Sequence, residues 1–341
     1  INPDHHTEVG YNLIKLYEPF SDIADIIRGH HTYWNYGEGY VYRGFKVPFF
    51  SHIIHLADRV SVLIDRDREI LGQVDSIVSI IDKNKGRLFV PGLVEIFKDI
   101  ASKEYFWFNL VSQNLSDIID EFIQPHVYLF HMDDLVQLSK LFSAIIDFRS
   151  SFTATHSAGV AQCAENIALY MRMDEDDRKG IKAAGYLHDL GKLAIPSEIL
   201  EKNGRLTSHE YNIMKTHVYY TYVALNTVNG LEEINRWSSY HHERLDGSGY
   251  PFHLNAKQLP LGSRIVAVSD IFVALIEERP YKERLSKRQV INIMEGMVKN
   301  GGIDGEIMSI LKWNYGYIYD KTAIAQTKAK ELYEKIKESL S

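Results

Sequence analysis

Histidines and aspartates are concentrated in one stretch of the sequence, between residues 156 and 270. The set consists of His156, the adjacent pair His188 and Asp189, His217, the pair His241 and His242, and Asp270. An imidazole binds one transition-metal ion at a time, whereas a carboxylate has two oxygens and can bridge two ions. Two ions about 3.5 to 4 Å apart can generate hydroxide near neutral pH and hold a phosphodiester for in-line attack. The set therefore predicts a two-metal site that hydrolyses phosphoesters.

The composition limits the class of protein that can carry this site. The chain has 341 residues, 45% of them hydrophobic and 24% charged, which is enough for two packed domains and is unlike a disordered chain. A net charge of -7 offers no broad basic surface to DNA. The single cysteine, Cys163, excludes a disulfide scaffold and a cysteine-based zinc module. With no apolar run long enough to span a membrane and no signal-peptide pattern, we expect a cytoplasmic protein.

The elements that must position these residues are helices. Apolar residues recur at helical spacing in eight segments: 53–64, 71–81, 93–100, 135–146, 160–171, 181–187, 265–276 and 290–298. Prolines stand where helices would begin or loops turn, at Pro48, Pro91, Pro196 and Pro260. Further helices are expected at 105–130 and 132–148, and a charged amphipathic helix with a solvated face at 321–341. The pattern predicts an all-α fold.

The sequence also contains an internal repeat. His6, the pair His30 and His31, Gly37 to Tyr40, Pro48 and Asp58 are matched by His217, the pair His241 and His242, Gly247 to Tyr250, Pro260 and Asp270. In both copies 24 residues separate the single histidine from the pair, and ten separate the proline from the aspartate. We therefore predict a duplicated helical module whose first copy is truncated at its N-terminus.

Two motifs of the second copy resemble those of a known family. Leu187 to Pro196, with the sequence LHDLGKLAIP, and His241 to Pro251, with the sequence HHERLDGSGYP, are similar to the motifs of HD-GYP proteins in the HD phosphohydrolase superfamily. The resemblance covers about 147–313 well and reaches the first copy only through the repeat. It implies domains at 1–100 (a truncated, degenerate HD-type copy), 101–146 (a helical connector) and 147–341 (the HD-GYP catalytic domain).

The resemblance implies a phosphodiesterase that hydrolyses cyclic di-GMP to pGpG and onward to GMP. The seven residues of the set would bind two divalent ions, iron or manganese, with Asp189 as the bridging ligand and His156 near a third metal in some members. Those members have a glutamate one turn before the histidine, where this chain has Phe152. We therefore predict two ions rather than three.

Four residues resemble the substrate-binding groups of the family. Lys192 lies three residues after Asp189, and its ammonium could stabilise negative charge on a phosphate oxygen. Tyr250, Arg279 and Lys282 would contact the dinucleotide, with the arginine fork suited to a phosphate or a guanine edge. The family commonly has an aspartate three residues after Asp270, where this chain has valine. That departure leaves a mixed cyclic GMP-AMP or pGpG open as the substrate.

The first copy differs in its loop and has no counterpart of the Arg-Pro-Tyr-Lys segment, so we expect it to be a degenerate domain used for packing, homodimerisation or sensing. Its His6, His30, His31 and Asp58 follow no His-Asp pair, so the copy alone cannot assemble a two-metal site. Two alternatives come from other classes of protein. One is a cyclic-dinucleotide receptor without turnover, and the other is an HD hydrolase of another nucleotide.

Overall fold

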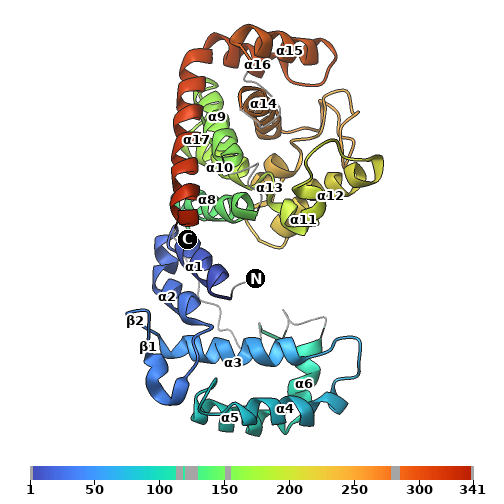
Figure 1. The fold of residues 1–341 in the computed structure, drawn as a ribbon. Coiled ribbons are helices and arrows are strands. Elements are labelled where there is room, and N and C mark those ends of the chain that lie inside the picture. The colour runs from blue at the N-terminus through green and yellow to red at the C-terminus, as the bar shows by residue number, and fades with distance from the viewer. Residues whose placement is uncertain (1–2, 113–117, 120–129, 150–154, 278–284, 339–341) are drawn as a thin grey trace. The chain divides into compact units, whose positions relative to one another are not determined.

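A computed structural model of the chain describes residues 3–112, 118–119, 130–149, 155–277 and 285–338 (Figure 1). Apart from one short hairpin, the regular elements of these residues are helices, which confirms the predicted all-α fold. The chain divides into two compact units, Ile1–Leu129 with Ser339–Ser341 and Phe130–Glu338. None of the described helices has the length and the apolar character that a membrane span requires.

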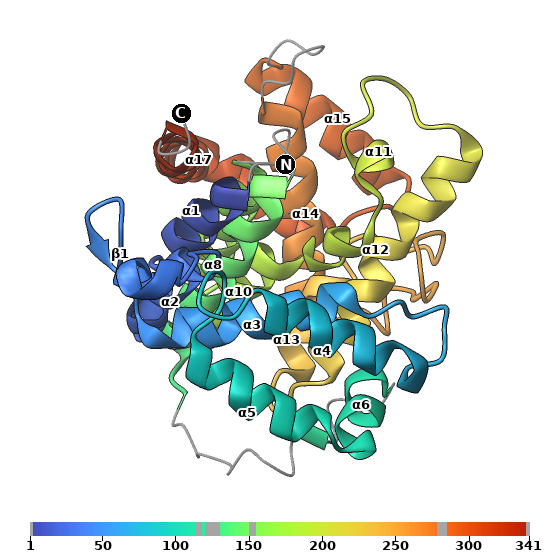
Figure 2. The ribbon, with the colours of Figure 1, turned by 60° about the horizontal axis from the view of Figure 1, so that its bottom comes forward.

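The first unit contains short helices around a core of its own. Its elements are α1 (Pro3–Ile14), η1 (Glu18–Phe20), α2 (Ser21–Gly29), η2 (Asn35–Tyr40), the antiparallel hairpin of β1 (Val41–Tyr42) and β2 (Phe45–Lys46), α3 (Phe49–Leu63), η3 (Leu71–Gln73), α4 (Val74–Lys83), α5 (Pro91–Ala101) and α6 (Glu104–Val111). The hairpin was not expected from the sequence. Figure 2 shows α4 and α5 side by side, and their buried residues Ile81 and Val94 join Trp107 of α6 in the core.

The second unit contains longer helices and the larger core. Its elements are α8 (Met132–Arg149), α9 (His156–Tyr170), α10 (Glu175–Leu187), η4 (Leu190–Ala194), α11 (Ser197–Leu200), α12 (Ser208–Asn226), α13 (Glu232–Ser239), α14 (Leu261–Ile276), α15 (Lys287–Lys299), α16 (Gly305–Trp313) and α17 (Tyr315–Glu338). Each of the eight periodic segments lies within or largely overlaps a helix. The buried apolar faces of α9, α10 and α14 meet in the core.

Helix starts follow the chemistry of their first residues. Pro48 and Pro260 are the N-cap residues of α3 and α14, and their fixed φ suits a position just outside a helix. Thr207 begins α12 with a capping box, because its hydroxyl accepts from the backbone N–H of Glu210 and the Glu210 carboxylate accepts from the backbone N–H of Thr207. The positions of Pro48 and Pro260 agree with the prediction that prolines mark the starts of helices.

The C-terminal helix α17 is amphipathic in the way that its charge pattern indicates. Figure 1 shows it running along α9, against which it packs. Ile318 and Thr322 are fully buried on the packed face, and Lys330 and Glu334 are exposed on the other. The helix therefore closes the core of the second unit while its charged face remains solvated.

The segment 101–146, which we expected to connect two domains, is divided between the units. Trp107 of α6 is buried in the core of the first unit, and its indole N–H donates to the carbonyl of Ala101 at 2.8 Å. Helix α8 packs against α10, with Leu135 in the core of the second unit. Most of the expected helix 105–130 beyond α6 lies outside the described residues. The start of the segment therefore packs into the core of the first unit, and its end packs into the core of the second.

The backbones of α9 and α10 approach each other closely at Gly185. A Cβ atom at this position would lie 2.6 Å from Cα of Ala161 and 2.9 Å from its nitrogen. These atoms belong to the backbone of α9, so they cannot move aside as a side chain could. Gly185 lies three residues before His188, so the contact fixes the last turn of α10, from which His188 follows.

We expect Gly185→Ala to destabilise the protein by about 1 to 3 kcal/mol, because the added methyl group forces α9 and α10 apart. The matched control is Gly296→Ala in α15, where a Cβ atom would meet nothing within 4 Å. The control should be neutral or stabilising by up to about 1 kcal/mol, owing to the higher helix propensity of alanine. Thermal unfolding followed by circular dichroism compares the two variants. Equal midpoints would contradict the close contact.

Candidate metal centre

The seven predicted ligands come from five parts of the second unit and meet at one place. His156 begins α9, His188 and Asp189 lie at the junction of α10 and η4, His217 lies in α12, His241 and His242 follow α13, and Asp270 lies in α14. Their ligand atoms form three overlapping groups, each within 4.8 Å: His217 with His241 and His242, His156 with His188 and Asp270, and His188 with Asp189 and His241. The spacing in the sequence thus corresponds to a compact site.

Asp189 lies at the centre of the site, and its two oxygens face different partners. Oδ2 lies 3.2 Å from Nε2 of His188 and 2.6 Å from Nζ of Lys192. Oδ1 lies 3.4 Å from Nε2 of His217. A carboxylate whose oxygens face imidazoles from two sides has the geometry of a bridging ligand.

Backbone carbonyls orient three of the imidazoles. In each of these histidines Nδ1 lies close to the carbonyl oxygen three residues earlier in the chain. The distances are 2.8 Å from His188 to Gly185, 2.7 Å from His217 to Met214 and 2.6 Å from His241 to Ser238. An Nδ1–H that donates to a carbonyl leaves Nε2 with its lone pair, which is the form that binds a metal.

Burial and neighbouring charges set the protonation of the site. Burial lowers the pKa of His217 to about 4 and that of His241 well below its usual value, so both rings are neutral at pH 7. Burial alone would raise the pKa of Asp189, but His188 and Lys192 hold it well below its usual range. Burial also opposes ionisation of Asp270, and its hydrogen bond with His156 outweighs this and lowers its pKa. Neutral imidazoles and ionised carboxylates are the forms that bind metal ions.

The donor atoms fit divalent transition-metal ions. Among the described residues, neither Nε2 of His217 nor Nε2 of His241 has a hydrogen-bond partner, although both atoms are buried. A buried polar atom without a partner is unfavourable, and a metal ion would satisfy both nitrogens. Imidazole and carboxylate together suit iron, manganese or zinc. The residues present therefore fit a pair of such ions.

Glu277 is a residue of the site that the sequence analysis missed. Its Oε2 lies 3.4 Å from Nδ1 of His156, and Oε1 accepts a hydrogen bond from Thr155 at 2.7 Å. Asp270 contacts the other nitrogen of His156 at 3.0 Å, so the ring lies between two carboxylates. Burial lowers the pKa of His156, but these two partners outweigh burial and raise it to about 10. The only signal in the sequence is the seven-residue spacing from Asp270, which places the two residues on one side of α14 and is common among helix-terminal acids.

The predicted substrate-binding residues are only partly described. Lys192 lies in the site and forms an ion pair with Asp189, and the centre of the Tyr250 ring lies 5.0 Å from that of His242. Arg279 and Lys282 lie outside the described residues, as does Phe152, on which the two-ion prediction partly rests. The structure therefore brings together every described member of the predicted set.

The glycine-rich loop after His242 is held by a buried glutamate. Glu243 is 4% exposed, and its carboxylate accepts from the backbone N–H groups of Phe252 at 2.6 Å and Leu254 at 3.0 Å. Gly249 passes so close to Glu243 that a Cβ atom would lie 2.4 Å from its Cα. Gly247 has a φ of 80°, which favours glycine. Much of the motif therefore folds the loop that presents Tyr250.

Comparison with known proteins finds similar sequences and a similar fold. The HD domain family matches residues 140–307. A 3′3′-cGAMP-specific phosphodiesterase of Vibrio cholerae is 31% identical over 93% of this chain and 75% of its own length. A cyclic di-GMP phosphodiesterase response regulator of Xanthomonas campestris is 40% identical, over 43% of this chain and 39% of its own length. The crystal structure of a cyclic GMP-AMP specific phosphodiesterase of V. cholerae superposes with a TM-score of 0.60 and 25% identity, covering 91% of this chain and 71% of the other.

The match over 93% of the chain and the HD domain match agree with the geometry of the second unit. The matched HD domain contains all seven predicted ligands: His156, His188, Asp189, His217, His241, His242 and Asp270. The similarity to the 3′3′-cGAMP-specific phosphodiesterase covers 93% of the chain, so it includes most of the first unit as well. The chain belongs to the HD-domain family of cyclic dinucleotide phosphodiesterases.

Proposed function

We propose that this protein hydrolyses a phosphodiester bond of a cyclic dinucleotide to give the linear dinucleotide, in a metal-dependent reaction. The observation that carries the proposal is the position of Asp189, which faces His188 with one oxygen and His217 with the other. Two divalent ions, iron or manganese, would supply Lewis-acid activation of water and neutralise phosphate charge when bound.

The side chains of the chain divide the remaining work. His217, His241 and His242 would hold one ion, and His188, Asp270 and Asp189 the other, with Asp189 shared. His156 lies against Asp270 and Glu277, so it orients the Asp270 carboxylate, and it would offer a ligand atom after it loses its proton. Two ions rather than three remain our proposal. Glu277 is the carboxylate that would complete a third position beside His156.

Lys192 supplies a positive charge beside the bridging carboxylate. Its ammonium is 2.6 Å from Oδ2 of Asp189 and its side chain is largely buried. A phosphate held at the site would lie within reach of this compact charge, which stabilises the negative charge that develops on the phosphate oxygens. Tyr250 would line the substrate position next to His242.

Two cyclic dinucleotides are candidates, and we favour 3′3′-cGAMP over cyclic di-GMP. The relatives that align with 93% and 85% of this chain are named as 3′3′-cGAMP-specific, whereas the named cyclic di-GMP phosphodiesterase of X. campestris aligns with 43%. Val273 is fully buried in the core, at the position where the resembled family commonly has aspartate. Valine therefore puts an apolar side chain where the resembled family has a carboxylate.

The first unit is proposed to be a degenerate HD-type copy that does not hydrolyse the substrate. Asp58, the counterpart of Asp270, is paired with its neighbour Arg59 through Nε at 2.9 Å instead of with a histidine. The predicted homodimer and the cytoplasmic location stay predictions.

We expect the untagged protein with manganese or ferrous iron to convert 3′3′-cGAMP into the linear dinucleotide, with kcat/KM about tenfold above that for cyclic di-GMP. Asp189→Ala should abolish turnover of both and release bound metal, because one substitution removes a ligand of both ions. The matched control Asp58→Ala should retain full turnover. Product analysis by chromatography and metal analysis of the purified proteins provide the measurements. Tight binding without product would identify a receptor, and equal loss in both variants would place catalysis in the first unit too.

We expect Lys192→Met to lower kcat by roughly a hundredfold while bound metal is retained, because the charge that stabilises the transition state is lost. The matched control is Lys202→Met, since Lys202 also pairs with a carboxylate, Glu210, at 2.6 Å but lies outside the site. The control should keep the kcat of the unmodified protein. An unchanged kcat in Lys192→Met would assign Lys192 a structural role only.

We expect the metal-free protein to lose stability as the pH falls from 7 to 5. The pKa of His217 is about 4 in the folded protein against 6.5 as its ordinary value, so the unfolded chain binds the proton first. This difference amounts to about 2 kcal/mol between these two pH values. Urea denaturation after chelation measures the effect, which should shrink in His217→Gln and persist in the exposed-site control His209→Gln. An unchanged pH dependence in His217→Gln would show that His217 is not the group responsible.

A further inference from the structure

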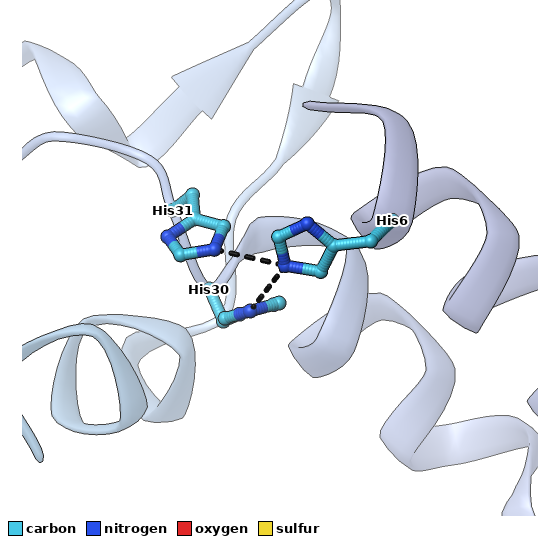
Figure 3. Close-up of side chains that lie close together, drawn as sticks. All are labelled: His6, His30 and His31. Atoms are coloured by element: carbon cyan, nitrogen blue, oxygen red, sulfur yellow. Dashed lines mark hydrogen bonds between the residues drawn. The ribbon is translucent and has the colours of Figure 1, made fainter. Parts of the chain in front are cut away.

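The first unit contains a second cluster of histidines, formed by His6, His30 and His31. Figure 3 shows the three rings turned toward one another, with His6 in contact with both of the others. Nε2 of His6 lies 2.9 Å from Nε2 of His31 and 3.3 Å from Nε2 of His30. The ligand atoms of all three lie within 4.8 Å of one another. Helices α1 and α2 pack together and hold the rings in this arrangement.

His30 is oriented for metal binding. It is the C-cap residue of α2, and its Nδ1 lies 2.5 Å from the carbonyl oxygen of Ile27, three residues earlier. Donation from Nδ1 leaves the lone pair of Nε2 directed toward His6 and His31. His241 in the second unit makes the same contact with Ser238.

The cluster has the same internal geometry as the corresponding histidines of the second unit. The paired histidines have ring centroids 4.2 Å apart in the first unit and 4.1 Å apart in the second. The single histidine lies 5.2 and 4.7 Å from the pair in the first unit, and 5.7 and 5.3 Å in the second. The loops also correspond, since Gly37 and Gly247 both have positive φ, and Gly39 and Gly249 both pass close to preceding backbone.

We propose that His6, His30 and His31 form a second metal site, which binds one transition-metal ion independently of the catalytic site. Three imidazoles suit zinc, cobalt, nickel or ferrous iron, and they disfavour magnesium and calcium, which prefer oxygen ligands. Among the described residues, the group of His6, His30 and His31 contains no carboxylate. The nearby Asp58 accepts a hydrogen bond from Arg59. Without a bridging carboxylate the cluster holds one ion rather than two.

The site opens onto a cavity, which leaves coordination positions for water or a small ligand. The cavity has a volume of about 820 Å³, and its lining includes His6, His31, Tyr33 and Arg28. A site with three protein ligands and an accessible remaining position is the arrangement of reactive and ligand-binding metal centres, whereas structural sites are closed by four protein ligands. The first unit therefore presents an ion to solvent rather than using it only to hold the fold.

The test uses cobalt(II) as the probe and the untagged full chain. In a background of His188→Ala, Asp189→Ala and His241→Ala, which removes ligands of both proposed ions of the second unit, we expect binding of one cobalt ion per chain with visible d–d absorption. Adding His30→Ala and His31→Ala should weaken binding at least about a hundredfold and remove the absorption, since two of three ligands are lost. The control adds His209→Ala and His253→Ala to the same background and should bind cobalt unchanged.

Circular dichroism and the melting temperature show whether each variant folds, and His6→Ala alone removes one ligand without altering the end of α2. No cobalt binding in the background variant would overturn the proposal, as would unchanged binding after His30 and His31 are replaced. The outcome is separate from that of the proposed function. His30→Ala with His31→Ala in the otherwise unmodified protein should retain cyclic dinucleotide hydrolysis, and Asp189→Ala should retain the cobalt site of the first unit.

Discussion

The structure of the second unit depends on an ionised carboxylate that is almost completely buried. Asp189 is 3% exposed, and burial of its charge would be strongly unfavourable without partners. Lys192 and two imidazoles surround it, each supplied by the short segment η4 or by a neighbouring helix. Lys192 supplies the opposite charge and the imidazoles supply polar nitrogens, so α10, η4 and α12 converge on this point. The packing of these helices with α9, α13 and α14 also brings the seven ligand residues into three overlapping groups, each with ligand atoms within 4.8 Å.

Much of this arrangement could be predicted from the sequence, because the signals are local. Apolar periodicity and prolines at helix starts predicted the helices, and the spaced set of histidines and aspartates indicated which residues meet at the site. The partner of His156 could not be found in this way. Glu277 reaches His156 only through the packing of α14 against α9, and its position in the sequence resembles that of an ordinary helix-terminal acid. Tertiary contacts of this kind leave a weak trace in one sequence.

The same reasoning applies to residues 101–146, which we expected to form a helical connector. Residues 101–146 have a helical pattern, and periodicity does not indicate which core a helix faces. In the structure, Trp107 is buried in the core of the first unit and Leu135 in the core of the second. The structural role of Glu243 could not be predicted either, because the sequence motif does not show which backbone groups its carboxylate contacts. Its two hydrogen bonds to backbone N–H groups show that it holds the loop in place.

Helix ends explain how both units come to hold clustered imidazoles. Carbonyls in the last turn of a helix lack intrahelical partners, so a donor close by stabilises the end. His188, His241 and His30 each supply this donor through Nδ1, to the carbonyls of Gly185, Ser238 and Ile27. The same hydrogen bond turns Nε2 away from the helix and leaves it able to bind a metal. A histidine at such an end therefore stabilises the helix whether or not an ion is bound, so a unit that lacks the bridging carboxylate can still keep its imidazoles in metal-binding geometry.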